Sequence, residues 1–249
     1  MKLIILAAGK GKRLRPLTND VPKCMVKYQN KEIISQILDV ANDKFEQIAV
    51  VGGYKFDILK DFLKHKDVKF YENTDFAKTN MVYTLFCARE FLKGDIVISY
   101  ADIVYSEKIL QEVLKFSNKF GVMVDLAWRD LWKQRMNDPL SDAETLKIKD
   151  EKIVELGKKP LSYDEIQAQY MGLMKINGDF LPTIIKFYDS LDRDKTYDGN
   201  DFKNMYMTSF IQMIIDKFGC VEPIRVKGGW VEVDSVGDLD TKAINCTKN

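Results

Sequence analysis

A glycine-rich and strongly basic segment near the start of the chain carries the clearest chemical signal. Gly9 and Gly11 directly follow a short apolar run. Residues 1–31 contain eight Lys and Arg residues but only one acid, Asp20. Glycine lets a backbone approach a ligand closely, and successive free N–H groups in such a loop form an anion-binding concavity. The segment therefore predicts a phosphate-binding loop, with a solvated glycine turn as the alternative.

Two familiar phosphate-binding motifs do not fit this segment. A dinucleotide-binding loop requires a third glycine where Leu14 stands, and an acid at the end of the second strand, where Gly52 and Gly53 stand. A P-loop requires a Lys-Ser or Lys-Thr pair after its spaced glycines, and Lys12-Arg13 does not supply one. The loop must therefore belong to another class.

Two aspartates at the ends of predicted strands are candidate ligands for a divalent cation. Asp102 follows the apolar run 96–101, and Asp234 follows the run 230–233, in which Glu232 lies on the same face as Asp234. Hard cations that bridge phosphate oxygens bind carboxylates. As alternatives, a strand-end aspartate can be the N-cap of the next helix, and an alternating acidic face can simply be solvated.

Length and charge narrow the classes of function. The chain of 249 residues can form one α/β domain or two small ones. Because 38 Lys and Arg balance 37 Asp and Glu, giving a formal net charge of +1, we expect no nucleic-acid partner. No apolar run reaches the roughly 20 residues of a membrane span, so we expect no membrane insertion. The short apolar start, followed at once by charges, is not typical of a signal peptide and favours a cytoplasmic location.

The histidine and cysteine counts exclude further chemistry. His65 is the only histidine, so one chain cannot build a site from two or three His ligands. A catalytic triad would need His65, whose surroundings are typical of a solvated helix end. Cys24, Cys87, Cys220 and Cys246 lack metal-binding spacing and are predicted to be free thiols.

Apolar runs alternate with helical patterns and predict the elements that position these residues. Strands are expected at 3–8, 48–51, 68–71, 96–100, 122–128, 170–176, 221–226 and 230–233, a β-hairpin at 145–149 and 152–156, and later helices at 180–191 and 205–218. This order predicts an α/β fold with a doubly wound, mostly parallel central sheet and a small lobe that contains the hairpin. We expect a single domain, 1–249, with halves 1–127 and 128–249. Ligands of such sheets bind at the carboxyl ends of the strands.

The basic loop resembles that of the nucleotidyltransferases that activate phosphorylated sugars and alcohols. The matching residues are Leu6-Ala7-Ala8-Gly9, Gly11, Arg13-Leu14, Pro16-Leu17-Thr18 and Pro22-Lys23. The resemblance implies a Rossmann-like fold and an enzyme that attaches a nucleoside monophosphate to a phosphate monoester and releases pyrophosphate. It also implies that Arg13 and Lys23 are catalytic phosphate-binding residues and that Asp102 and Asp234 bind one or two Mg²⁺ ions.

The same resemblance implies a nucleotide site at the carboxyl edge of the sheet. The implied nucleotide-binding residues are Leu6, Ala7, Ala8, Gly9, Gly11, Lys23, Gly53, Asn73, Thr79, Asn80, Tyr83, Ala101 and Asp102. Met81 departs from the pattern, because the cytidylyltransferases have a second Asn there. The first half, 1–127, would thus bind the nucleotide, and the second half, 128–249, would bind the acceptor and close the site.

Further stretches resemble the phosphocholine cytidylyltransferase branch of this superfamily. They are residues 128–132, 138–145, 154–160, 169–173 and 229–235. By this resemblance the catalytic residue Lys159, or Lys158 if the register differs by one, would hold the acceptor phosphate. The other implied acceptor-binding residues are Tyr170, Gly172, Trp230 and Glu232. Aromatic rings that could face a quaternary ammonium are those of Trp128, Trp132, Trp230, Tyr170, Tyr197 and Tyr206, with core packing as the alternative.

Taken together, the resemblance implies a CTP-dependent cytidylyltransferase that uses Mg²⁺. Its partners would be the small molecules CTP and a phosphate monoester: phosphocholine, phosphoethanolamine or a phosphorylated amino acid such as phosphoglutamine. The product would serve capsule or other cell-surface polysaccharide or lipid decoration. The alternatives are a sugar-1-phosphate uridylyl- or thymidylyltransferase and a nucleotide-binding module without catalysis. The oligomeric state stays open.

Overall fold

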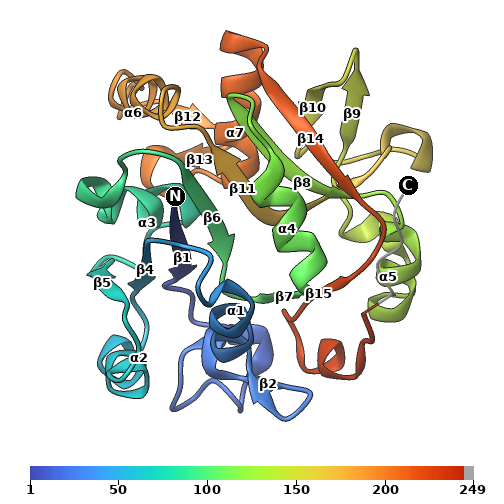
Figure 1. The fold of residues 1–249 in the computed structure, drawn as a ribbon. Coiled ribbons are helices and arrows are strands. Elements are labelled where there is room, and N and C mark those ends of the chain that lie inside the picture. Colours follow the sequence, from blue (N-terminus) through green and yellow to red (C-terminus); the bar gives the residue numbers. More distant parts are fainter. Residues whose placement is uncertain (244–249) are drawn as a thin grey trace.

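A computed structural model describes residues 1–243 of the chain. Its centre is a seven-stranded sheet with the strand order β14-β8-β11-β6-β1-β4-β5 (Figure 1). The strands are β1 (Lys2–Ala7), β4 (Gln47–Gly52), β5 (Lys69–Glu72), β6 (Ile96–Tyr100), β8 (Phe120–Asp125), β11 (Gln169–Ile176) and β14 (Val221–Val226). Neighbours pair in parallel except around β11, which is antiparallel to both β6 and β8. The prediction of a mostly parallel central sheet is therefore confirmed.

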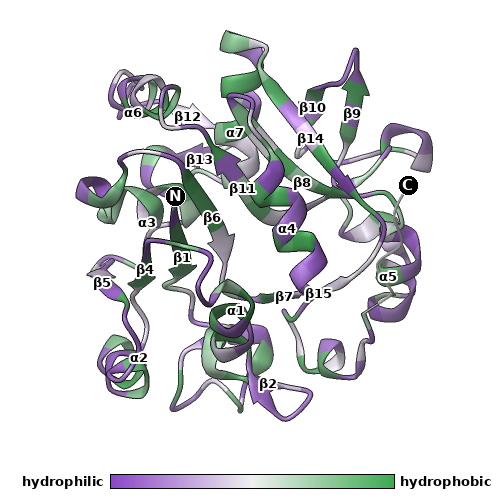
Figure 2. Ribbon diagram, in the orientation of Figure 1, coloured by the Kyte–Doolittle hydropathy of each residue, from purple (hydrophilic) through white to green (hydrophobic). Residues whose placement is uncertain are grey.

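Helices cover both faces of the sheet because the central strands are apolar on both sides. Leu3 and Ile5 of β1 belong to one hydrophobic cluster, and Ile4 and Leu6 belong to the other. The first cluster includes residues of α1 (Ile33–Ala41), α2 (Phe56–Leu63), α4 (Glu107–Lys115) and α5 (Trp128–Arg135), and the second includes residues of α3 (Met81–Cys87), α6 (Leu181–Asp189) and α7 (Met207–Phe218). Figure 2 shows the central strands β1, β6 and β8 as hydrophobic ribbons between helices of mixed character. This is the doubly wound arrangement.

The order of the strands creates a ligand-binding edge beside β1. From β1 the chain proceeds outward through β4 and β5, and then returns to place β6 on the other side of β1. Such a change of direction opens a crevice at the carboxyl ends of the strands. The backbone N–H of Ala101, just past β6, donates to the carbonyl of Leu6 at 3.2 Å, so these two strand ends stay together.

Short antiparallel pairs surround the main sheet. They are β2 (Lys27–Tyr28) with β3 (Lys31–Glu32), β7 (Ile103–Tyr105) with β15 (Trp230–Glu232), β9 (Leu146–Lys149) with β10 (Lys152–Leu156), and β12 (Thr196–Tyr197) with β13 (Asn200–Asp201). The β9–β10 pair is the predicted hairpin, and its turn residues Asp150 and Glu151 both have positive φ. The backbone N–H of Leu156 donates to the Gln212 side chain at 2.7 Å, which fastens the hairpin to α7.

The predicted strand 122–128 is wrong at its end. The strand stops at Asp125, and Trp128 begins helix α5. The cause is the Asp125 carboxylate, which is fully buried and accepts hydrogen bonds from the N–H groups of Ala127 at 2.7 Å and Gly228 at 2.9 Å. These bonds turn the chain immediately after the strand.

The single histidine and three of the four cysteines lie in the described part of the chain. His65 is exposed just beyond α2. Cys24, Cys87 and Cys220 are free thiols, and Cys246 lies outside the described residues. Within residues 1–243, none of the helices has both the length and the apolar character that crossing a membrane requires.

Candidate active site

A cavity of about 90 Å³ lies at the carboxyl ends of β1 and β6. Its lining residues are Leu6, Ala7, Ala8, Gly9, Lys23, Cys24, Phe76, Thr79, Asn80, Met81, Thr84, Ala101 and Asp102. We call it the first cavity. It collects all of the predicted nucleotide-binding residues except Gly11, Gly53, Asn73 and Tyr83. Cys24, Phe76 and Thr84 also line it but were not predicted from the sequence, and Met81 was expected only as a departure from the family pattern.

Two of the four predicted residues outside the lining, Gly11 and Gly53, allow close packing of segments beside the cavity. Gly11 has φ +57°, and a Cβ there would lie 3.0 Å from side-chain carbons of both Lys23 and Thr18. A Cβ at Gly53 would lie 2.6 Å from the Cβ of Phe76 and 3.0 Å from the carbonyl oxygen of Ala8. Both glycines therefore allow segments that line the cavity to approach one another.

Asn73 supports the cavity, whereas Tyr83 lies outside its lining. Asn73 is buried, and its amide donates to the hydroxyls of Thr79 and Thr84, each at 2.9 Å. It thereby fixes two cavity residues in place. The ring of Tyr83 lies beneath the ammonium of Lys203, 5.6 Å from the ring centroid.

An acidic cluster lies beside the first cavity. Asp102 follows β6, and its carbonyl accepts a hydrogen bond from the N–H of Val233 at 2.8 Å, so the pairing of β7 with β15 brings Asp102 next to Asp234. Oxygen atoms of Asp102, Glu232 and Asp234 lie within 4.8 Å of one another. Strand ends far apart in the sequence thus form the pair that the sequence singled out.

Lys23 lies among these carboxylates. Its ammonium is 2.7 Å from Asp102 Oδ2 and also contacts Asp234 Oδ1, and its side chain is only 13% exposed. Burial by itself lowers the pKa of Lys23, but the charges of Asp102, Asp234 and Glu232 outweigh burial and raise the pKa above its usual value. Arg13, which is largely exposed, contacts the other oxygen of Asp234. The two predicted basic residues therefore meet the two predicted metal ligands.

The donor set of this cluster fits a hard divalent cation. Asp102 Oδ1 is buried and has no hydrogen-bond partner among the described residues. A buried oxygen of that kind is costly unless it finds a ligand. Carboxylate oxygens from Asp102 and Asp234 are the ligands that such cations prefer. The chain therefore has an acidic group that could bind a metal ion.

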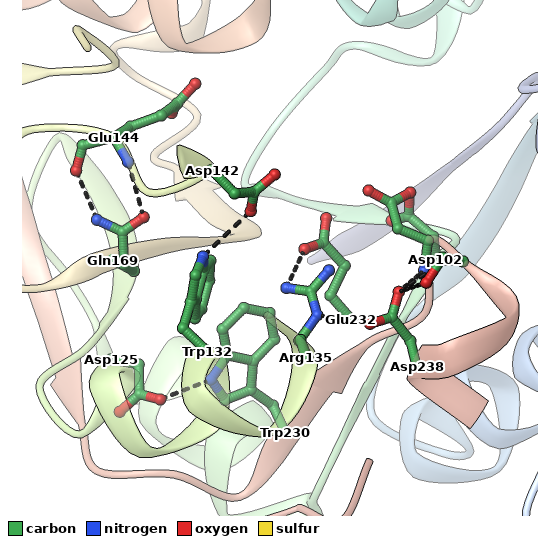
Figure 3. Close-up of polar contacts among 12 residues, drawn as sticks. Asp102, Asp125, Trp132, Arg135, Asp142, Glu144, Gln169, Trp230, Glu232 and Asp238 are labelled. Carbon is green, nitrogen blue, oxygen red and sulfur yellow. Dashed lines mark hydrogen bonds and ion pairs between the residues drawn. The ribbon is translucent and has the colours of Figure 1, made fainter. Parts of the chain in front are cut away.

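Arg135 orients the third carboxylate and the loop that carries Asp234. Its side chain is 1% exposed, with Nη1 2.8 Å from Glu232 Oε2 and Nε 2.9 Å from Asp238 Oδ1 (Figure 3). The other Asp238 oxygen accepts the backbone N–H groups of Asp234 at 2.9 Å and Ser235 at 2.7 Å. Burial raises the pKa of Glu232 despite the opposing charge of Arg135. No local pattern had indicated Arg135, because a basic residue near a helix end is usually solvated.

A second cavity of about 250 Å³ adjoins the acidic cluster. Its lining residues are Asn80, Met81, Tyr100, Trp132, Asp142, Glu144, Gln169, Tyr170, Tyr206, Met207, Thr208, Glu232 and Asp234. Asn80 and Met81 also line the first cavity, so the two cavities meet at the start of α3. Of the predicted acceptor-binding residues, Tyr170 and Glu232 line the second cavity, and so do the predicted rings of Trp132 and Tyr206.

Trp230 and Gly172 have structural positions near this cavity. Trp230 is buried, and its indole N–H donates to Asp125 Oδ2 at 2.9 Å (Figure 3). Gly172 has φ +75°, and a Cβ there would lie 2.7 Å from the ring of Tyr100. Gly172 therefore makes room for a ring that lines the cavity. Of the other predicted rings, Trp128 is buried and Tyr197 packs near Phe202.

Lys158 and Lys159 lie outside the lining of both cavities. The Lys158 ammonium is 3.0 Å from Glu155. The Lys159 ammonium donates to the carbonyls of Leu140 and Ser141, each at 2.7 Å. Their contact with an acceptor phosphate stays a prediction.

The fold and the site define the chain as a nucleotidyltransferase. The solved structure of the inositol-1-phosphate CTP transferase from T. maritima is similar, with a TM-score of 0.74 at 20% sequence identity, over 96% of this chain and 91% of that one. Residues 3–135 match the family described as the MobA-like NTP transferase domain, and the chain belongs to this family.

Two curated relatives extend the comparison. The CTP:phosphoglutamine cytidylyltransferase of Campylobacter jejuni is 47% identical over 250 residues, which cover 97% of this chain and 99% of the relative. The choline-phosphate cytidylyltransferase of Streptococcus pneumoniae is 35% identical over 124 residues, 49% of this chain and 53% of that protein. The predictions of the fold, the superfamily and a nucleotidyltransferase activity are confirmed.

Proposed function

We propose that this chain is a cytidylyltransferase that transfers CMP from CTP to phosphoglutamine or a closely related amine-bearing phosphorylated compound. The observation that carries the proposal is the 47% identity with the CTP:phosphoglutamine cytidylyltransferase over nearly the whole of both chains. The product would serve capsule or other cell-surface decoration, and the reaction would take place in the cytoplasm.

The two adjoining cavities fit the two substrates of this reaction. In the proposed complex the cytosine and ribose occupy the first cavity, against Ala7, Ala8 and Asn80, and the acceptor occupies the second. An oxygen of the acceptor phosphate attacks the α-phosphorus of CTP. The bond from the α-phosphorus to the oxygen that bridges it to the β-phosphate breaks, and pyrophosphate leaves with that electron pair. The new bond joins CMP to the acceptor phosphate.

The chain contributes charge and position in this mechanism, and it needs no protein nucleophile. The ammonium of Lys23 contacts the carboxylates of Asp102 and Asp234. It would therefore lie where the phosphate oxygens of CTP approach the acidic cluster. Arg13, at the exposed side of Asp234, would bind the departing phosphates. Mg²⁺, held by Asp102 and Asp234, would neutralise charge on the phosphate oxygens. Arg135 keeps Glu232 and the 234–238 loop in place.

Nucleotide and acceptor panels test the proposal. The chain is first screened for thermal stabilisation by CTP, UTP, dTTP and ATP, because a ligand that binds only the folded state raises the melting temperature. Pyrophosphate release is then measured with Mg²⁺ and phosphoglutamine, phosphocholine, phosphoethanolamine and glucose-1-phosphate. We expect CTP and phosphoglutamine to be the best pair.

Other outcomes of these panels identify the alternatives. A preference for UTP or dTTP together with glucose-1-phosphate would establish a sugar-1-phosphate nucleotidyltransferase. CTP binding without turnover of any acceptor would favour a nucleotide-binding module.

A further inference from the structure

We infer that Asp142 and Glu144 are the specificity-determining residues of the second cavity and bind the positively charged amino group of the acceptor. The inference rests on the proposed function, because it concerns the acceptor of that reaction. Neither residue was among the predicted site residues, and neither belongs to the acidic cluster of Asp102, Glu232 and Asp234.

The second cavity is acidic at both ends. Asp142, Glu144, Glu232 and Asp234 line it, and no Lys or Arg is among its lining residues. Glu232 and Asp234 belong to the end that adjoins Asp102, where the α-phosphate of CTP and a divalent cation would bind. Figure 3 shows Asp142 and Glu232 lying between Glu144 and Asp102, so Glu144 marks the far end. An acceptor that spans the cavity therefore places its phosphate near Asp234 and its other end near Asp142 and Glu144.

The carboxylates at the far end lack a positive partner within residues 1–243. Glu144 forms no side-chain hydrogen bond or ion pair there, and Asp142 accepts one hydrogen bond, from the indole N–H of Trp132 at 3.1 Å. Burial and the nearby charge of Asp142 raise the pKa of Glu144 to about 7. A neutral acceptor would leave the repulsion between the Asp142 and Glu144 carboxylates in place, whereas an ammonium group would relieve it.

The backbone that carries the two acids is held firmly. Gln169 binds the backbone of Glu144 twice, accepting from its N–H at 3.1 Å and donating to its carbonyl at 2.5 Å (Figure 3). On the other side, Lys159 donates to the carbonyls of Leu140 and Ser141. The backbone beneath the two acids is therefore fixed in advance, which reduces the ordering cost of binding a cation. In this arrangement Lys159 acts on the acceptor through the 140–144 segment.

Aromatic groups complete an environment suited to an amine. The rings of Tyr100 and Tyr170 meet edge to face at 5.8 Å between centroids, and Trp132 lies beside Asp142. The Tyr170 hydroxyl is buried and has no hydrogen-bond partner among the described residues. Aromatic faces attract cations, and the free hydroxyl can bind a polar group of the ligand.

The test compares Glu144→Gln and Asp142→Asn with the wild type, using phosphoglutamine and its N-acetyl derivative, in which a neutral amide replaces the charged amino group. Asp130→Asn is the matched control, because Asp130 is an exposed acid of the same half, outside the cavity. Acceptor KM, CTP KM and kcat are measured by pyrophosphate release. Acceptor binding is also measured by calorimetry without CTP, which is independent of turnover.

We expect each cavity variant to raise the acceptor KM about 10- to 100-fold, as for loss of a charge-assisted hydrogen bond, with CTP KM unchanged. The preference for phosphoglutamine over the N-acetyl derivative falls by a similar factor, and Asp130→Asn behaves as the wild type. The inference is overturned if both cavity variants bind phosphoglutamine within about twofold of the wild type, or if the wild type binds both acceptors equally. Absence of turnover with every acceptor would instead refute the proposed function, while the calorimetry still decides the inference.

Discussion

Replacing Lys23 with methionine probes the electrostatic balance of the acidic cluster. Lys23 is 13% exposed and bridges Asp102 and Asp234, whose oxygens, together with one from Glu232, lie within 4.8 Å of one another. Methionine retains most of the side-chain volume but removes the charge. The variant therefore leaves closely spaced carboxylates without their central cation.

The cost of this change follows from the burial of the pair. Breaking a buried ion pair by removing one partner costs about 3–5 kcal/mol, because the remaining charge is desolvated and uncompensated. For a chain of this size, 1 kcal/mol corresponds to roughly 2–4 °C, so the melting temperature without divalent cations should fall by about 6–20 °C. Mg²⁺ should restore much of this loss, because in the variant it meets carboxylates that no ammonium neutralises.

Differential scanning fluorimetry with and without about 10 mM MgCl₂ measures both effects. The control is Lys27→Met, because Lys27 is 63% exposed and lies 3.7 Å from Glu32. We expect the control to melt close to the wild type. The reasoning is refuted if Lys23→Met melts within about 2 °C of the wild type without Mg²⁺, or if Mg²⁺ stabilises the two proteins equally.

Three further predictions follow from the site. Arg135→Met should destabilise the fold by about 3–5 kcal/mol in denaturant unfolding, because it leaves Glu232 and Asp238 unpaired; a loss below about 1 kcal/mol would contradict this. Gly172→Ala should raise the acceptor KM, since φ +75° and the 2.7 Å approach to Tyr100 force the cavity wall to move; an unchanged KM would count against it. Because burial raises the pKa of Glu144 from 4.5 to about 7, the folded state binds more protons than the unfolded state between these values, and stability falls as pH rises through them. Glu144→Gln should remove this pH dependence, and its free energy of unfolding above pH 7 should exceed that of the wild type by up to about 3 kcal/mol. Superimposable plots of unfolding free energy against pH for the two proteins would refute this prediction.

The site residues that could be predicted from the sequence are those that closely follow an apolar strand of the parallel sheet. The aliphatic run of β1 fits a buried strand, so Gly9, which follows it closely, was expected at its carboxyl end. Asp102 follows a second such run, and parallel neighbours deliver their ends to one edge. These positions follow from burial and from the direction of the strands.

The parts that were not predictable depend on contacts between distant segments. Asp142 and Glu144 follow the short 3-10 helix Pro139–Ser141, and nothing in their spacing indicates that Trp132 and Gln169 hold them at a cavity. Arg135 likewise resembles a solvated helix end until Asp238, from the other end of the chain, covers it. Such pairings need the tertiary structure, because each residue taken alone fits an exposed position.

The most direct test of the proposed transfer is pyrophosphate release by Asp102→Asn, with CTP, Mg²⁺ and phosphoglutamine. Asparagine keeps the shape of the side chain but removes the charge that faces Lys23 and that would bind a divalent cation. We predict that kcat falls at least about 100-fold, while the exposed control Asp57→Asn keeps wild-type activity. Near wild-type pyrophosphate release by Asp102→Asn would contradict the assignment of this acidic cluster as the catalytic centre.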